Sequence, residues 1–206
     1  MKTKWLLFKI IIAIQTICTP LHVFGTDWRT LHSGQSGFVP SQAIIQYAGN
    51  MGALSIGTSW NYGKNKQWET DLCLGYVPKG NTNSSKATIT IRENYVPWFK
   101  HIGNSHIYIE PLTCSIFLNT IFGDNFWQHQ PNRYPEHYYE KLSTKTRVHI
   151  AFGQRIELEL AKGIIRSIGL YYEFNTYDLR IRSLFQGEGV KFSDLWSLAI
   201  GFRCRF

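Results

Sequence analysis

The sequence is poor in charge and in cysteine, and beyond its first residues it has no long apolar run. Charged residues make up 17% of the 206 residues, whereas aromatic residues reach 15% and include 7 Trp and 11 Tyr. Few charges together with many aromatic residues exclude a disordered chain. After Gly25 no stretch reaches 18 apolar residues, so the sequence predicts no membrane-spanning helix there. The length fits one domain with a sizeable core.

Cysteine is too sparse to define a scaffold. Beyond residue 25 the chain retains only Cys73, Cys114 and Cys204, which are neither clustered nor paired. Disulfide-rich domains and zinc sites need clustered or paired cysteines, so both classes are excluded. We expect the three residues to be small apolar positions within strands. The sequence predicts no cofactor and no metal site.

The first 25 residues have the pattern of a secretory signal peptide. Lys2, Lys4 and Lys9 precede or interrupt a short apolar stretch, and cleavage is expected near Gly25. A transmembrane anchor is the alternative, but this stretch is too short to cross the hydrocarbon layer as a helix. Removing these residues lowers the net charge from +8 to +5, because three lysines and no acidic residues are lost. The remaining basic residues are dispersed, so no nucleic-acid partner is expected.

The rest of the chain alternates between bulky apolar residues and small or polar residues with a period of two. Such alternation predicts β-strands whose two faces differ in chemistry. In the last segment Leu198, Ile200 and Phe202 alternate with Ala199 and Gly201. The pattern predicts eight strands, in residues 42–47, 52–62, 68–78, 87–95, 108–120, 147–153, 167–175 and 196–206. Residues 177–182 continue an extended pattern with a switched phase, which predicts a bulge or a strand standing above the membrane.

A soluble β-sandwich would alternate too, but the composition of the two faces favours a barrel in a membrane. Gly, Ala and Ser fill the less bulky face of several strands, as the narrow interior of a small closed barrel requires. Aromatic residues gather at strand ends, as in the aromatic girdles of membrane barrels. They are Trp60, Tyr62, Trp68, Tyr76, Tyr95 and Trp98. The predicted fold is an all-β, closed, antiparallel, eight-stranded transmembrane β-barrel with one long external loop.

The C-terminal strand carries a resemblance to a known class. Its apolar residues Leu198, Ile200 and Phe202 lead to a terminal Phe206. This arrangement resembles the C-terminal signal of bacterial outer-membrane β-barrels, and the layout is similar to the small eight-stranded type with OmpA-like and OmpX-like architecture. The resemblance implies location in the bacterial outer membrane, contact with outer-membrane lipid and lipopolysaccharide, and recognition of Phe206 by the barrel-assembly machinery.

Eight strands place both ends of the barrel segment on the periplasmic side, with the longest connections outside. Accordingly, residues 26–40 are expected to form a periplasmic leading segment and residues 41–206 the barrel. The longest connection, residues 123–143, then falls outside.

Charged residues on the inward face are the first group of candidate functional residues. Charges in a narrow lumen need partners in a low dielectric, so we expect a plug of ion pairs and hydrogen bonds. A proton path or a substrate site is the alternative. The candidates are Glu69, Asp71, Arg92, Arg147, His149, Glu173, Arg203 and Arg205.

The long external loop is the second candidate site, because aromatic residues and arginine are enriched there as in recognition surfaces. The loop is expected to cap the barrel mouth or to bind a surface ligand or a protein partner. A metal site is a weaker alternative, since no ligand spacing in the loop is diagnostic. The candidate residues are Trp127, His129, Arg133, Tyr134, His137 and Tyr138.

Some small barrels of the class that this chain resembles modify lipid A, so a catalytic site is an alternative. The deacylase pattern has a His, one intervening residue and a Ser on a strand, with a Glu beyond them. Here His149 is followed by Ile150 and Ala151, so the nucleophile is missing. The favoured hypothesis is therefore a non-enzymatic barrel with a filled lumen. A lipid A-modifying deacylase or acyltransferase, and an accessory subunit of a larger outer-membrane complex, are the alternatives.

Overall fold

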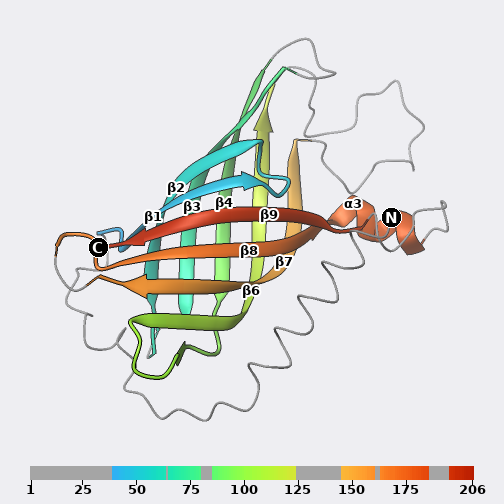
Figure 1. Ribbon diagram of the computed structural model, residues 1–206. Helices are drawn as coiled ribbons and strands as arrows, with labels where there is room; N and C mark the ends of the chain where they lie inside the picture. The colour runs from blue at the N-terminus through green and yellow to red at the C-terminus, as the bar shows by residue number, and fades with distance from the viewer. Residues whose placement is uncertain (1–38, 64, 80–84, 124–144, 161–162, 186–194) are drawn as a thin grey trace, which may run out of the picture.

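The protein is a closed eight-stranded antiparallel β-barrel (Figure 1). The computed structural model describes residues 39–63, 65–79, 85–123, 145–160, 163–185 and 195–206. The barrel strands are β1 (Gln42–Ala48), β2 (Leu54–Tyr62), β3 (Trp68–Val77), β4 (Lys86–Tyr95), β6 (Ile107–Phe122), β7 (Thr146–Glu159), β8 (Ser167–Tyr177) and β9 (Ser197–Arg205).

Two pairings close the ring. β1 pairs with β9, so the first and last strands of the barrel meet, and β4 pairs with β6 on the other side. The two-residue strand β5 (Lys100–His101) adds to the end of β6 without entering the ring. Closure leaves no unpaired sheet edge, so every barrel strand has a neighbour on each side.

The two ends of the barrel differ in their connections. We call one the turn end, where β2 leads to β3, β4 to β6 and β7 to β8, and where β9 finishes. We call the other the loop end, where β1 leads to β2, β3 to β4, β6 to β7 and β8 to β9. The helix α3 (Asp178–Phe185) follows β8 at the loop end, opposite Phe206 in Figure 1.

The barrel places its apolar side chains outside and its polar side chains inside. Among the described residues, 29 large hydrophobic side chains are exposed, whereas nine hydrophobic residues are buried. The buried set instead contains Glu69, Asp71, Arg92 and many other polar residues. Within the described part of the chain, no helix is both long and apolar enough to cross a membrane.

The eight predicted strands and their antiparallel closure are confirmed, but the extended structure predicted for residues 177–182 is wrong. The last residue of β8 that pairs with β7 is Tyr177, and the last that pairs with β9 is Asn175. Beyond Tyr177 the chain makes no further pairs with β7, although β7 extends to Thr146, and it forms α3, in which the backbone groups are satisfied within the helix. Asp178 lies in the first turn of α3, where a carboxylate is favourable near the helix N-terminus, and it accepts a hydrogen bond of 2.8 Å from the Leu179 amide. An alternating pattern of only six residues is too short to distinguish a strand from a helix.

A bulge in β6 changes which side chains face inward. The register between β6 and β7 shifts between Glu110 and Thr113. Both residues are buried although they lie three positions apart, so the bulge reverses the alternation of the strand. On the outer face the Gln154 amide donates a hydrogen bond of 3.0 Å to the Pro111 carbonyl within this irregular stretch.

Candidate functional site: a charged cluster in the lumen

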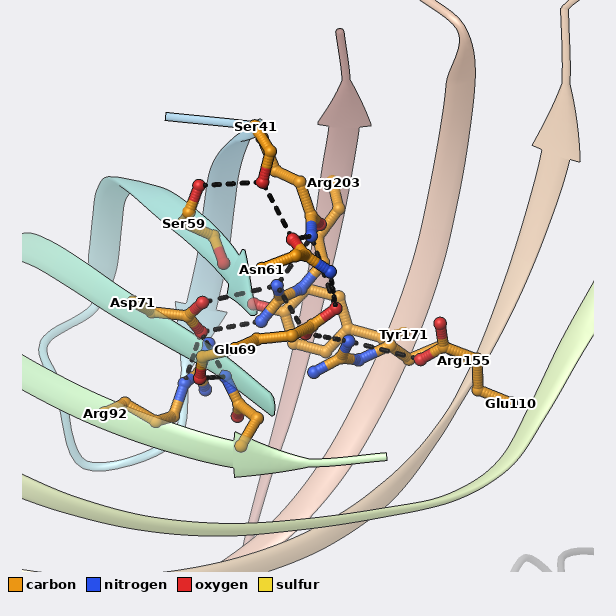
Figure 2. A network of polar contacts seen from close by, with 12 residues as sticks. Ser41, Ser59, Asn61, Glu69, Asp71, Arg92, Glu110, Arg155, Tyr171 and Arg203 are labelled. Carbon is orange, nitrogen blue, oxygen red and sulfur yellow. Dashed lines mark hydrogen bonds and ion pairs between the residues drawn. The ribbon is translucent and has the colours of Figure 1, made fainter. Parts of the chain in front are cut away.

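Two carboxylates on β3 are the centre of a polar network inside the barrel (Figure 2). Glu69 and Asp71 are two residues apart on one strand, so both point to the same face of the sheet. Both are fully buried. A carboxylate in such surroundings needs cations and hydrogen-bond donors around it.

Guanidinium groups from the neighbouring strand β4 and from the opposite wall supply these partners. Arg92 on β4 donates to Asp71 through Nε at 2.9 Å and to both oxygens of Glu173 on β8 through one terminal nitrogen at 2.9 Å. Arg203 on β9 reaches Asp71 at 2.6 Å and Glu69 at 3.2 Å. These contacts connect β3, β4, β8 and β9 across the lumen.

A second group of ion pairs lies nearer the turn end. Arg155 on β7 contacts Glu69 at 2.5 Å and Glu110 on β6 at 3.2 Å. Arg205 forms an ion pair of 2.7 Å with Glu157. The whole assembly, which we call the charged cluster, contains four guanidinium groups and five carboxylates. Its members are Glu69, Asp71, Arg92, Glu110, Arg155, Glu157, Glu173, Arg203 and Arg205, none more than 7% exposed.

Neutral amides complete the hydrogen bonding of the two central carboxylates. The Asn61 amide donates to Glu69 at 2.9 Å, and the Asn94 amide donates to Asp71 at 2.8 Å. Ser115 in turn donates to the Asn94 carbonyl oxygen at 2.7 Å. The central carboxylates are therefore surrounded by donors from several strands, which stabilises their charged form in the interior.

Tyr171 extends into the middle of the charged cluster. Its ring lies 5.3 Å from the guanidinium carbon of Arg203 and 6.0 Å from those of Arg92 and Arg155, within the range of cation–π attraction. Its hydroxyl donates to Gln46 at 2.7 Å. Gly201 makes room for the ring, because a Cβ at that position would lie 2.4 Å from Tyr171 Cζ.

The lumen nearer the loop end has a different composition. Here the Asn119 amide donates to Thr90 Oγ1 at 2.9 Å, and His149 stacks on Phe117 with the ring centroids 4.5 Å apart. Met51 and Cys73 are buried in the same half. We call Met51, Cys73, Thr88, Thr90, Phe117, Asn119 and His149 the neutral cluster.

The structure brings together six of the eight lumen residues named from the sequence: Glu69, Asp71, Arg92, Glu173, Arg203 and Arg205. Arg147 does not join them, because it lies near the loop end, 3.7 Å from Asp178. His149 is buried but lies in the neutral cluster, between the rings of Phe117 and Tyr177.

Sequence reasoning missed Glu110, Arg155, Glu157 and Tyr171. Arg155 and Glu157 continue the inward parity of His149 and were missed because β7 is longer than predicted. Tyr171 follows the parity of Glu173 on β8, which would have identified it. Glu110 could not be found by parity, because the bulge inverts the alternation in its strand.

The external-loop candidates lie outside the described residues: Trp127, His129, Arg133, Tyr134, His137 and Tyr138. The predicted signal peptide, and the leading segment up to residue 38, lie outside them too. Within the described ranges, no three His, Cys, Asp or Glu side chains are arranged to hold a metal ion.

The geometry of the charged cluster is that of a plug. Its side chains contact one another from opposite walls, and nearly all of their charge is compensated within the lumen. Comparisons with protein-family models, with curated proteins and with solved structures found no match to this chain.

Proposed function

We propose that this protein is an integral outer-membrane β-barrel that serves as a closed, non-conducting and non-catalytic membrane scaffold. The observation that carries the proposal is the inverted distribution of side chains, with an apolar outer face around the ring and a charged interior. A protein in water gains free energy by burying apolar surface, so this distribution is favourable only when lipid surrounds the barrel.

Strand length supports the same conclusion. A transmembrane β-strand needs about 9–11 residues. Five of the eight barrel strands have this length: β2 and β9 have 9 residues, β3 and β4 have 10 and β8 has 11, whereas β1 has 7, β7 has 14 and β6 has 16. Exposed aromatic residues near both ends of the apolar band, such as Trp68 at the turn end and Tyr76 at the loop end, fit the girdles that meet lipid headgroups.

The plug supports the non-conducting role. Eight strands enclose an interior that side chains can fill, and the charged cluster crosses it between β3 and β9 and between β4 and β8. An ion that entered would have to displace buried ion pairs whose partners have no water to replace them.

Expression of the full chain in a Gram-negative host tests the proposal. We expect the protein in the outer-membrane fraction after an alkaline wash, with faster gel migration before boiling than after it. In planar bilayers the folded protein should give no steady single-channel current. A protein recovered only in the soluble fraction would contradict the membrane location, and porin-like current steps would contradict the plug.

Lipid A from strains that express the protein should keep its acyl pattern when analysed by mass spectrometry. A changed acyl pattern would replace the scaffold with the enzyme hypothesis.

A further inference from the structure

A carboxylate lies on the outer face of the barrel near the turn end. Glu93 on β4 has the parity of the exposed Ile91, so its side chain points away from the lumen. It faces Thr70 in the register between β3 and β4. Thr70 Oγ1 donates to one carboxylate oxygen at 2.7 Å, and the Tyr62 hydroxyl donates to the other. The two hydroxyl groups hold the carboxylate against the outer wall.

The position of Glu93 along the strand is at the boundary of the apolar band. Ile91, two residues toward the loop end, is 55% exposed. Tyr95, two residues toward the turn end, packs against Trp68 with ring centroids 4.7 Å apart. At about 3.3 Å per residue, Glu93 lies within ~7 Å of the apolar residue Ile91 on one side and of the aromatic residue Tyr95 on the other. In a membrane this is the level at which headgroups begin.

The electrostatic surroundings of Glu93 differ from those of the lumen carboxylates. Glu69, Asp71 and Glu173 each contact a guanidinium group. Among the described residues, no Lys, Arg or His forms an ion pair with Glu93, whose hydrogen bonds come from the hydroxyl groups of Tyr62 and Thr70. Tyr62 at the end of β2 and Trp68 at the start of β3 are also exposed. A carboxylate beside electron-rich rings is the chemistry that binds an ammonium group.

We propose that Glu93, together with Tyr62, Trp68 and Tyr95, binds the ammonium headgroup of an ethanolamine phospholipid in the leaflet at the turn end. The carboxylate accepts hydrogen bonds from the ammonium, and the rings attract its charge. This site rests on the proposed function, because it needs the outer face to lie in lipid. It adds a specific lipid partner to a surface that otherwise selects only for apolar chains.

The test uses the full chain in nanodiscs that contain ethanolamine phospholipid, phosphatidylglycerol and an uncharged glucosyl diacylglycerol in equal amounts. Native mass spectrometry after detergent release measures which lipids remain bound. We expect the wild type to prefer the ethanolamine lipid over the uncharged lipid by roughly 3- to 10-fold. Glu93→Gln should lose this preference, and Trp68→Leu should reduce it.

Glu159→Gln is the control, because Glu159 also lies at the turn end and accepts a hydrogen bond from Tyr108, but it also has an imidazole, His106, at 4.0 Å. It should keep the wild-type preference. Equal preference in wild type and Glu93→Gln would overturn the site. A preference for the ethanolamine lipid over phosphatidylglycerol alone, and not over the uncharged lipid, would also overturn the site. Repulsion between the carboxylate and the anionic headgroup would then explain the result without any binding of the ammonium group.

Heat-dependent gel migration of each sample separates this proposal from the one on which it rests. A folded, inserted barrel without lipid preference overturns the headgroup site alone. A chain that does not insert into the nanodiscs contradicts the membrane scaffold and the site together.

Discussion

The two halves of the lumen are built on the same strands but are held together in different ways. In the turn-end half, Arg203 on β9 contacts Asp71 on β3, and Arg92 on β4 contacts Glu173 on β8. These strands are not neighbours in the ring. In the loop-end half, Asn119 contacts Thr90 on the adjacent strand, and His149 stacks on Phe117 of the adjacent strand. The charged cluster links opposite walls, whereas these neutral contacts reinforce pairings that the sheet already makes.

The difference follows from side-chain length and from the strength of the contacts. Arginine is long enough to reach past the nearest strand, and its fork of donors can serve carboxylates from two strands. The shorter side chains of Thr90 and Asn119 contact each other across adjacent strands only. We therefore expect the charged half to contribute most to stability, and the following variants test that expectation.

Removing one cross-lumen arginine should have the largest effect. In Arg203→Met, Glu69 and Asp71 lose a partner while they remain buried. Breaking a buried pair in this way costs about 3–5 kcal/mol. Urea unfolding in lipid vesicles, followed by tryptophan fluorescence, measures the loss. Arg182→Met on the exposed side of α3 is the control and should unfold like the wild type. An unchanged transition for Arg203→Met would show that the cross-lumen pairs carry no stability.

Filling the space beside Tyr171 should have an intermediate effect. In Gly201→Ala the new methyl group would meet the Tyr171 ring, so the ring has to shift from its place beside Arg203. Overpacking of this kind costs about 1–3 kcal/mol. Adding Tyr171→Leu should make the two costs less than additive, which a double-mutant cycle measures. Strict additivity would contradict the contact between Gly201 and Tyr171.

Truncation in the neutral cluster should have the smallest effect. Asn119→Ala removes a neutral hydrogen bond to Thr90, which is worth about 0.5–1.5 kcal/mol. The same urea titration measures it beside Arg203→Met. If Asn119→Ala destabilised the barrel as much as Arg203→Met, the two halves would not differ in the way described.

Strand parity predicted much of this lumen from the sequence, because in a closed barrel every second residue faces inward. Asp71, Arg92 and Arg203 follow directly from that rule. The rule fails where the backbone departs from regular pairing, as at the β6 bulge that turns Glu110 inward. It also fails where a strand loses its neighbours, as after Tyr177, where α3 begins.

Partner choice across the lumen could not be predicted from the sequence at all. Parity says that Arg155 faces inward, but its contact with Glu69 depends on the tilt of the strands and the stagger of the ring. Those quantities are set by the whole barrel rather than by any local stretch. The same holds for Tyr171, whose place among three arginines requires the gap at Gly201 on the next strand.

Lipid contact on the outer face of β6, β7 and β9 tests the central claim most directly. Nitroxide labels at Ile116, Leu118, Ile150 and Phe202, one at a time in a chain whose native cysteines are replaced by alanine, report collisions with molecular oxygen and with a water-soluble nickel complex. These four side chains are 42–55% exposed on the outer face. In nanodiscs we predict high access to oxygen and low access to nickel at all four positions. High access to nickel at these positions would mean that water, rather than lipid, covers the outer face of the barrel.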